Sequence, residues 1–282
     1  MLTTRRLGAF CNFFKEDPPH VSVDAKQANH LELYRRMLTV RLLEERLQQY
    51  CDRGEGTDLH FNRGQEAIAV GVCAALNPTD RICTHHRTIA HQIARGAPLV
   101  PLIAELLGKR TGCNGGRAGE MHLSNPEIGH DFSFQLVGTC IPVAAGLAWA
   151  LKYHHKRGEI VAVFFGDAAT SNGQFHEGLT IAAVRKVPLL LICENNHRAG
   201  NIGPEYYLPT DGVKERMAAY DIEGMRIDGN DVMSVTEWAF MAAERVRRTS
   251  KPYLLELDTQ RLCFHKQGQR DIRSPEVLAE LA

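Results

Sequence analysis

Two oxygen-bearing side chains in the middle of the chain could bind a hard cation. Asp167 follows the apolar run 160–165, and Asn196 follows a second apolar run, 187–193. A carboxylate and a carboxamide suit Mg²⁺, which usually takes few protein ligands and completes its octahedron with phosphate oxygens and water. The alternative is that Asp167 caps the following helix while Asn195 and Asn196 form a turn, and the residue types alone leave both interpretations open.

The elements around these two residues predict that they lie together. Both apolar runs read as short buried strands. Between them, apolar residues at Phe175, Leu179 and Ala182 recur at helical spacing. A strand, a helix and a strand of this length form a βαβ unit, whose two strands are parallel neighbours. Because ligands bind outside the carboxyl ends of parallel strands, Asp167 and Asn196 should share a ligand-binding edge.

Composition and motifs exclude several classes of function. Neither G-x-x-x-x-G-K-[ST] nor G-x-G-x-x-G occurs, so neither a P-loop nor a dinucleotide fingerprint explains these strand ends. Lys plus Arg and Asp plus Glu number 33 each, so no net field favours nucleic acid or an acidic membrane. No apolar run approaches the ~20 residues of a membrane span. The eight cysteines include no C-x-x-C pair, which indicates a reducing, cytoplasmic location.

The rest of the chain continues the alternation of helices and strands. We expect an unprocessed arm over residues 1–27 and one domain over residues 28–282, without internal repeats. The alternation predicts an α/β fold with a parallel sheet and helices on both faces. The expected elements are a long helix from Asn29 to about Gly54, a helix from Gln65, a short strand at 82–86, a Gly-rich loop at 108–121, an Ala-rich helix ending near Tyr153, and a strand, helix and strand at 221–228, 231–248 and 253–259.

Several stretches, in order from about Leu31 to His265, resemble one family. The central segment GDAATSNGQFHEGLTIAAVRKVPLLLICENN is similar to the thiamine diphosphate motif of the α subunits of 2-oxo acid dehydrogenases, in which GDG is followed about one βαβ unit later by NN. That family includes the first, decarboxylating components of the pyruvate, branched-chain and acetoin systems. Further similar stretches are HFNRGQEAIAVG, DRICTHHRTIAHQIARG, LIAELLGKRTGCNGGRAGEMHL, VGTCIPVAAGLAWALKY and PYLLELDTQR.

The resemblance implies a parallel-sheet thiamine-diphosphate-binding fold that holds the cofactor with Mg²⁺. Side-chain oxygens of Asp167 and Asn196 and the backbone carbonyl of Arg198 would bind the metal. By its type alone Arg87 could form a surface salt bridge, but the Arg of the family motif contacts the diphosphate, and His86 stands where the family commonly has Tyr. Further implied cofactor contacts are at Gly166, Ala168, Ala169 and Asn196, and at backbone groups from Gln135 to Val137, which would bind the aminopyrimidine ring.

Two histidines are candidates for proton handling. His60 precedes the helix from Gln65, where a lone histidine is often structural. His265 lies in a polar segment that we expect to be a mobile loop, where a histidine is ordinarily solvated. In the resembled family the corresponding histidines lie at the active site, and imidazole titrates near working pH. We therefore expect His60 and His265 to transfer protons or to orient the substrate.

The implied activity is decarboxylation of a 2-oxo acid, or cleavage of an acyloin, with transfer of the acyl or aldehyde unit to a lipoyl carrier. The resemblance also implies a β subunit that supplies the Glu that activates the aminopyrimidine, an α₂β₂ heterotetramer, and a lipoyl acyltransferase partner. The chain departs from the family at Ala168, where GDG has its second Gly, and at His197 and Arg198. Two alternatives stay open: a split thiamine enzyme that joins or transfers two-carbon or acyl units without a lipoyl partner, and a non-catalytic scaffold of the same fold.

Overall fold

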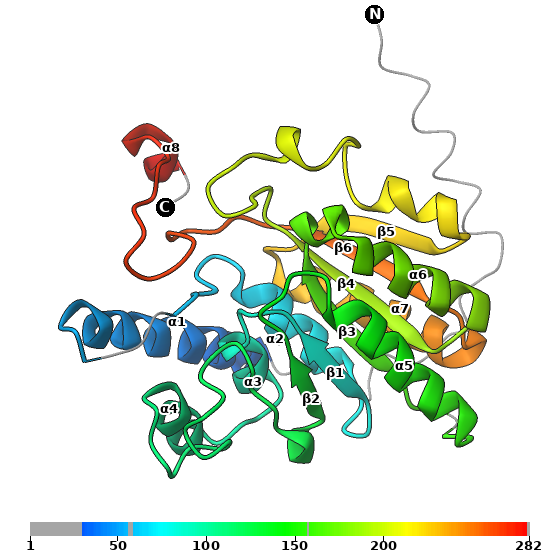
Figure 1. Ribbon diagram of the computed structural model, residues 1–282, viewed down its shortest axis with the longest axis horizontal. Helices are drawn as coiled ribbons and strands as arrows, with labels where there is room; N and C mark the ends of the chain where they lie inside the picture. The colour runs from blue at the N-terminus through cyan, green and yellow to red at the C-terminus, as the bar shows by residue number, and fades with distance from the viewer. Residues whose placement is uncertain (1–29, 56–58, 157, 281–282) are drawn as a thin grey trace, which may run out of the picture.

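The computed structural model describes residues 30–55, 59–156 and 158–280, and its centre is a six-stranded sheet (Figure 1). The arm predicted over residues 1–27 lies outside the described residues. The strand order is β2-β1-β3-β4-β6-β5, and every neighbouring pair is parallel. The strands are β1 (Arg81–Thr84), β2 (His130–Ser133), β3 (Val161–Gly166), β4 (Leu189–Asn195), β5 (Glu223–Asp228) and β6 (Tyr253–Asp258).

Side-chain caps set where two of the helices begin. Asn172 accepts a hydrogen bond from the backbone N–H of Gln174 at the start of α6, and Asp231 accepts one from Met233 at the start of α7. The α-helices are α1 (His30–Asp52), α2 (Glu66–Ala75), α3 (Ile89–Ala94), α4 (Leu99–Leu106), α5 (Cys140–Tyr153), α6 (Gly173–Arg185), α7 (Val232–Thr249) and α8 (Pro275–Glu280).

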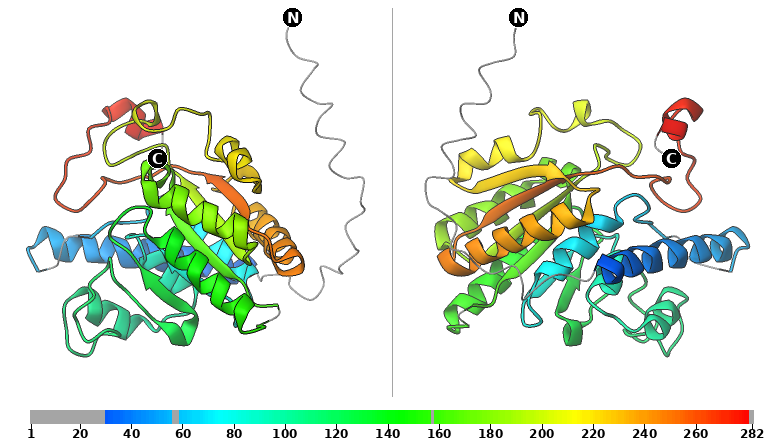
Figure 2. Two further views of the ribbon diagram at one scale, coloured as in Figure 1. Left: turned by 45° about the vertical axis from the view of Figure 1, so that its right-hand side comes forward. Right: turned by 180° about the vertical axis from the view of Figure 1, so that it is seen from behind.

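Helices cover both faces of the sheet. Successive side chains of a strand point to opposite faces, so Phe164 joins one apolar core with α2 and α7, whereas Phe165 joins a second core with α5 and α6. Figure 1 shows α5 and α6 together on one face, and the rear view of Figure 2 shows α7 on the other. The predicted α/β fold, with a parallel sheet and helices on both faces, is confirmed.

Helix α2 is buried in the larger core and anchors the segment before it. Almost all of its residues are buried, as expected for a helix that is apolar all round. At Gly71 a Cβ would stand 2.7 Å from Cγ1 of Val235 on α7, so the close approach of the two helices requires glycine. This packing fixes the position of the preceding segment, which carries His60 and Gln65.

The central βαβ unit has the predicted form. Strands β3 and β4 are parallel neighbours, with Gly166 opposite Glu194. Strand β4 begins at Leu189, slightly later than predicted, because Pro188 has no N–H to donate to a ladder. Strand β2 and helices α3 and α4 were not predicted, since elements this short do not reveal a hydrophobic period.

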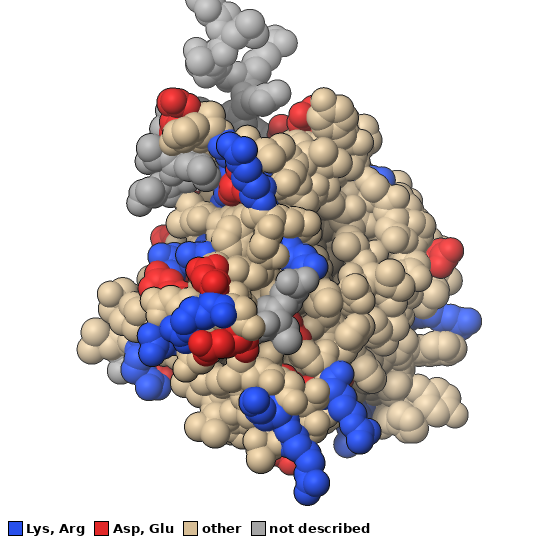
Figure 3. All heavy atoms as spheres, turned by 60° about the vertical axis from the view of Figure 1, so that its left-hand side comes forward, with Lys and Arg blue, Asp and Glu red and all other residues tan. Residues whose placement is uncertain are grey.

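None of the described helices is long and apolar enough to cross a membrane. Figure 3 shows acidic and basic side chains intermixed on one face, beside a broad uncharged area. This face therefore lacks the single-sign field that attracts a polyanion.

Candidate active site

Four strands end at one edge of the sheet and bring most candidate residues to it. β1 leads into His86 and Arg87, β3 into Asp167, β4 into Asn196, and β6 into the segment that carries His265. Since all these strands are parallel, their carboxyl ends face the same side, where α/β sheets bind ligands. The structure thus has Asp167 and Asn196 at one edge, as predicted.

Asp167 is almost completely buried, and its side chain accepts a hydrogen bond from the hydroxyl of Tyr207. Burial raises the pKa of the Asp167 carboxyl to about 6, although Tyr207 and nearby His197 lower it. A buried carboxylate whose partner is a hydroxyl is only partly compensated, so a bound cation would stabilise it. The alternative role as a helix cap is not observed for α6, because its cap is Asn172.

The backbone beside Asp167 carries other implied cofactor contacts. Gly166 ends β3, and Ala168 and Ala169 lie in the 3-10 helix η3 (Asp167–Ser171). Gly166 and Ala168 are half-buried, whereas Ala169 is buried in the core against α5 and α6. The side chain of Ala169 thus serves packing, which leaves its backbone as the part available to a ligand.

Two consecutive asparagines shape the loop after β4. Oδ1 of Asn195 accepts from the backbone N–H of His197 at 3.2 Å, and Oδ1 of Asn196 accepts from that of Arg198 at 3.1 Å. His197 adopts a left-handed conformation with φ +56°. Nδ2 of Asn196 donates to Oε1 of Gln65 at 2.7 Å, which joins this loop to the segment before α2. The turn interpretation of the two asparagines is confirmed, and it leaves the second lone pair of the Asn196 oxygen available to a metal ion.

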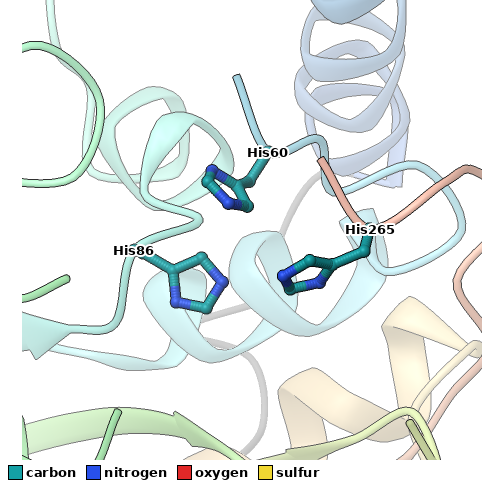
Figure 4. Close-up of side chains that lie close together, drawn as sticks. All are labelled: His60, His86 and His265. Atoms are coloured by element: carbon teal, nitrogen blue, oxygen red, sulfur yellow. The ribbon is translucent and has the colours of Figure 1, made fainter. Parts of the chain in front are cut away.

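Three imidazoles, those of His60, His86 and His265, point toward one another (Figure 4). The His60 ring centroid lies 4.7 Å from that of His86 and 5.3 Å from that of His265, and the last two are 6.0 Å apart. Burial lowers the pKa of His60 to about 3 and that of His265 to about 4, and the charge of Arg87 acts in the same direction. At neutral pH both rings are therefore neutral, with one donating and one accepting nitrogen each.

Arg87 is buried and joins three segments. Its Nη1 donates to the carbonyl of Phe61 at 2.8 Å, and its Nη2 donates to Nδ1 and to the carbonyl of His265 at 2.9 and 2.8 Å. These contacts hold the segment around His265, predicted to be mobile, against the rest of the site. Burial lowers the pKa of the guanidinium. A buried cation with neutral partners is suited to an anionic ligand such as a diphosphate.

Glu194, a buried carboxylate that holds the backbone of Arg87, was not predicted from the sequence. Its two oxygens contact Nε2 of His85 at 2.7 Å and Nε2 of His91 at 2.8 Å. The opposite nitrogen of His85 accepts from the backbone N–H of Arg87, and that of His91 donates to its carbonyl, both at 3.1 Å. The network fixes the turn after β1. The three histidines within residues 85–91 were the signal that could have indicated it.

Glu120, in the Gly-rich loop, was not predicted from the sequence either. Its Oε2 accepts from the backbone N–H of His60 at 2.8 Å and lies 3.1 Å from Nδ1 of the same residue. Both side chains are buried. Burial raises the pKa of Glu120 well above its usual range. Glycine spacing was the only pattern in this loop, and it gave no sign of the contact.

Two groups of side chains could offer ligands to a metal ion, because in each group the nitrogen or oxygen atoms lie within 4.8 Å of one another. They are His60, His86 and His265 in one, and His85, His91 and Glu194 in the other. In the first cluster, the positive charge of Arg87, which contacts His265, would repel a metal ion. In the second, hydrogen bonds already occupy the facing atoms of both histidines and Glu194. Neither cluster therefore suits a metal ion as well as the strand-end oxygens do.

Buried polar atoms without a partner gather around the histidines. Among the described residues, eight buried side-chain nitrogen and oxygen atoms lack a hydrogen bond, and five of them belong to Asn62, Gln65, His86 and Glu120. Buried polar groups are normally paired, so such a concentration indicates a ligand site. Amide, imidazole and carboxyl groups beside a buried guanidinium fit a polar cofactor that bears a diphosphate.

Gln135 and Val137 lie outside the histidine cluster. Both are exposed, and Leu136 between them is 70% exposed. The carbonyl of Val137 accepts from Nδ2 of Asn172 at 3.0 Å, which ties this segment to the start of α6. The structure therefore has the segment on the surface, beside the helix that follows Asp167.

Glu44 on α1 supports the segment that carries His60. It is fully buried, and both of its oxygens lie 2.8 Å from the backbone N–H of Asn62. Burial raises the pKa of Glu44 to about 8, above the value near 4.5 of the unfolded chain. Between these two values the folded state binds a proton that the unfolded state does not, so stability falls as pH rises.

We expect Glu44→Gln to remove this pH dependence. Between pH 5 and 8 the wild-type free energy of unfolding should fall relative to that of the variant by up to about 1.4 kcal/mol per pH unit. Urea unfolding at several pH values measures the difference. Glu45→Gln, at an exposed position of the same helix, is the control and should follow the wild type. Parallel curves for wild type and Glu44→Gln would contradict the assignment.

The α/β fold and the polar side chains at the carboxyl ends of its strands are typical of a cofactor-binding protein. Residues 34–276 match the family model for the dehydrogenase E1 component, and the chain belongs to this family. Members of the family depend on thiamine diphosphate and a divalent metal. The family and the cofactors predicted from the sequence are therefore confirmed.

Curated relatives and a solved structure agree with this assignment. The chain is 37% identical over 239 residues to the alpha subunit of acetoin:2,6-dichlorophenolindophenol oxidoreductase of Bacillus subtilis (strain 168), covering 84% of this chain and 72% of the relative. It is 34% identical over 280 residues to the chloroplastic pyruvate dehydrogenase E1 component subunit alpha-3 of Oryza sativa subsp. japonica, covering 93% and 64%. Transketolase from Campylobacter jejuni matches with a TM-score of 0.61 and 18% identity, over 80% of this chain and 37% of that one, which supports the fold.

Proposed function

We propose that the chain is the α subunit of a thiamine-diphosphate-dependent E1 component that decarboxylates a 2-oxo acid or cleaves an acyloin together with a β subunit. The observation that carries the proposal is the meeting of Asp167, Asn196 and Arg87 at one sheet edge in a chain of the E1 family. The relatives named above are alpha subunits of acetoin and pyruvate enzymes. We extend the proposal to an α₂β₂ assembly, a lipoyl acyltransferase partner and a cytoplasmic location, the last supported by the free cysteines of the described residues.

The strand-end residues would hold the cofactor. Asp167, Asn196 and the carbonyl of Arg198 would bind Mg²⁺, and no hydrogen bond of the described residues ends on that carbonyl. Arg87 would hold the diphosphate with the backbone of residues 166–169, and His86 has two buried ring nitrogens that could join it. Backbone groups from Gln135 to Val137 would contact the aminopyrimidine. When bound, the cofactor supplies a carbon nucleophile and an electron sink for the bond that breaks.

The histidines would handle protons at the substrate. Nδ1 of His265 accepts from Arg87, so the proton of this neutral ring is on Nε2, which can donate to a substrate oxygen. His60 is also neutral at working pH, so one of its ring nitrogens has a lone pair that faces the site as an acceptor. Their ring centroids are 5.3 Å apart, close enough for both to serve one bound molecule.

Turnover should require the β subunit, because we assign to it the carboxylate that activates the aminopyrimidine. The co-purified complex, with thiamine diphosphate and Mg²⁺, should reduce 2,6-dichlorophenolindophenol with pyruvate or acetoin as the substrate. The isolated chain should remain at background. Turnover by the isolated chain would place the activating carboxylate in this chain.

The same assay separates the alternatives. Formation of a carboligation product without dye reduction would favour the split thiamine enzyme. Absence of cofactor binding by the complex would favour the scaffold. Comparing pyruvate with acetoin is informative because relatives of both activities resemble this chain at similar identity.

A further inference from the structure

The contacts of Glu120 indicate that its carboxyl serves His60 rather than the loop that carries it. The loop is held by another carboxylate, Glu105 on α4, which accepts backbone N–H bonds from the four loop residues Asn114, Gly116, Ala118 and Gly119. The backbone of Glu120 is held separately, because its carbonyl accepts from the hydroxyl of Thr88 at 2.9 Å. The side chain of Glu120 therefore contributes little to the shape of the loop.

The hydrogen-bond partners of the Glu120 carboxyl are both on His60. Oε2 faces the backbone N–H, which can only donate, so Oε2 is an acceptor. The same oxygen lies 3.1 Å from Nδ1, and its second lone pair can accept a proton from that nitrogen. Oε1 is buried without a partner. In this arrangement the proton of the neutral His60 ring is on Nδ1, and Nε2 bears the lone pair.

The opposite arrangement holds at His265. A guanidinium only donates, so Nδ1 of His265 is the acceptor of Arg87 and Nε2 carries the proton. Glu120 and Arg87 thus set complementary states in two rings whose centroids are 5.3 Å apart. His60 presents an accepting Nε2, and His265 presents a donating Nε2–H.

We propose that Glu120 is a positioning residue that fixes the orientation and the Nδ1–H tautomer of His60, so that His60 accepts a proton beside the donating nitrogen of His265. The effect on turnover rests on the function proposed above, whereas the tautomer does not. Removing the hydrogen-bond partner of a metal-bound histidine typically costs about tenfold to hundredfold in activity, and we expect a loss of the same order for this imidazole.

The direct test is nitrogen NMR of the full chain with ¹⁵N-labelled histidine, in which the His60 signals are assigned by their loss in His60→Gln. In the wild type, His60 should show a protonated Nδ1 and an unprotonated Nε2. Glu120→Ala should shift the ring toward the Nε2–H tautomer, which is the preferred form of a neutral histidine side chain in water. Glu120→Gln should retain the wild-type pattern, because an amide oxygen can accept both N–H bonds.

The kinetic test uses the complex with the β subunit. Glu120→Ala should lower kcat by about tenfold to hundredfold, with KM changed by no more than about twofold, and Glu120→Gln should retain most of the activity. Glu105→Gln is the matched control, since it weakens the same loop without touching a histidine; it should lower the Tm and leave the His60 tautomer unchanged. Each variant is compared at a temperature where its Tm shows it to be folded.

Two results would overturn the proposal. One is an unchanged His60 tautomer in Glu120→Ala. The other is a loss of kcat in Glu105→Gln equal to that in Glu120→Ala, which would assign the effect to the loop. If the wild-type complex turns over none of the substrates, the function proposed above fails, while the NMR measurement still decides the tautomer.

Discussion

Replacing Asp167 by alanine should abolish the Mg²⁺-dependent binding of thiamine diphosphate. The carboxylate is buried at the end of β3, and its side-chain partner there is the hydroxyl of Tyr207. A charged oxygen ligand beside a metal–diphosphate pair contributes several kcal/mol, so its loss should remove binding rather than weaken it slightly. Calorimetry of the complex with the β subunit, with and without Mg²⁺, measures the effect.

Two further variants make this result interpretable. Asp167→Asn retains the oxygen but not the charge, and should bind weakly with a reduced dependence on Mg²⁺. Asp131→Asn is the control, because Asp131 is a buried aspartate on β2 paired with Arg81 at the opposite end of the strands. It should lower the Tm and leave the cofactor affinity within about twofold of the wild type, since a distant charge is screened. Unchanged affinity in Asp167→Ala would exclude Asp167 as a metal ligand.

The parts of the site that could be predicted from sequence are those set by periodicity and strand direction. Asp167 and Asn196 follow two apolar runs separated by one helix, and parallel pairing then requires a common edge. The turn at Asn195 and Asn196 was also predictable, because an asparagine side chain satisfies the backbone two residues on.

The parts that could not be predicted depend on contacts between segments that have no hydrophobic periodicity. Glu120 meets His60 across 60 residues, and Arg87 meets His265 across 178. Glu120 lies in a loop whose pattern showed only glycines. The position of His265 depends on Arg87, and the composition of its segment does not reveal that contact. The family motif placed both histidines near the cofactor, but it did not indicate which groups set their protonation.

Replacing Arg87 by methionine should reduce the affinity for thiamine diphosphate and Mg²⁺ by a factor of about 10² to 10⁴. The guanidinium is buried, and its partners among the described residues are two carbonyls and an imidazole, all neutral. Each hydrogen bond to a charged group contributes about 1.5 to 3 kcal/mol, and a forked contact with a diphosphate makes two of them. Arg87→Lys keeps the charge without the fork and should lose about tenfold.

The control for Arg87 is an arginine with similar partners and no role at this edge. Arg95 donates to the carbonyls of Ile128 and Asp80, far from the carboxyl ends of the strands. Arg95→Met should lower the Tm and leave cofactor affinity unchanged, whereas Arg87→Met should lose affinity even at temperatures where the cofactor-free complex is folded. If both variants lose affinity only in proportion to their Tm, Arg87 holds the three segments together and does not bind the diphosphate. Wild-type affinity in a folded Arg87→Met complex would likewise contradict the assignment.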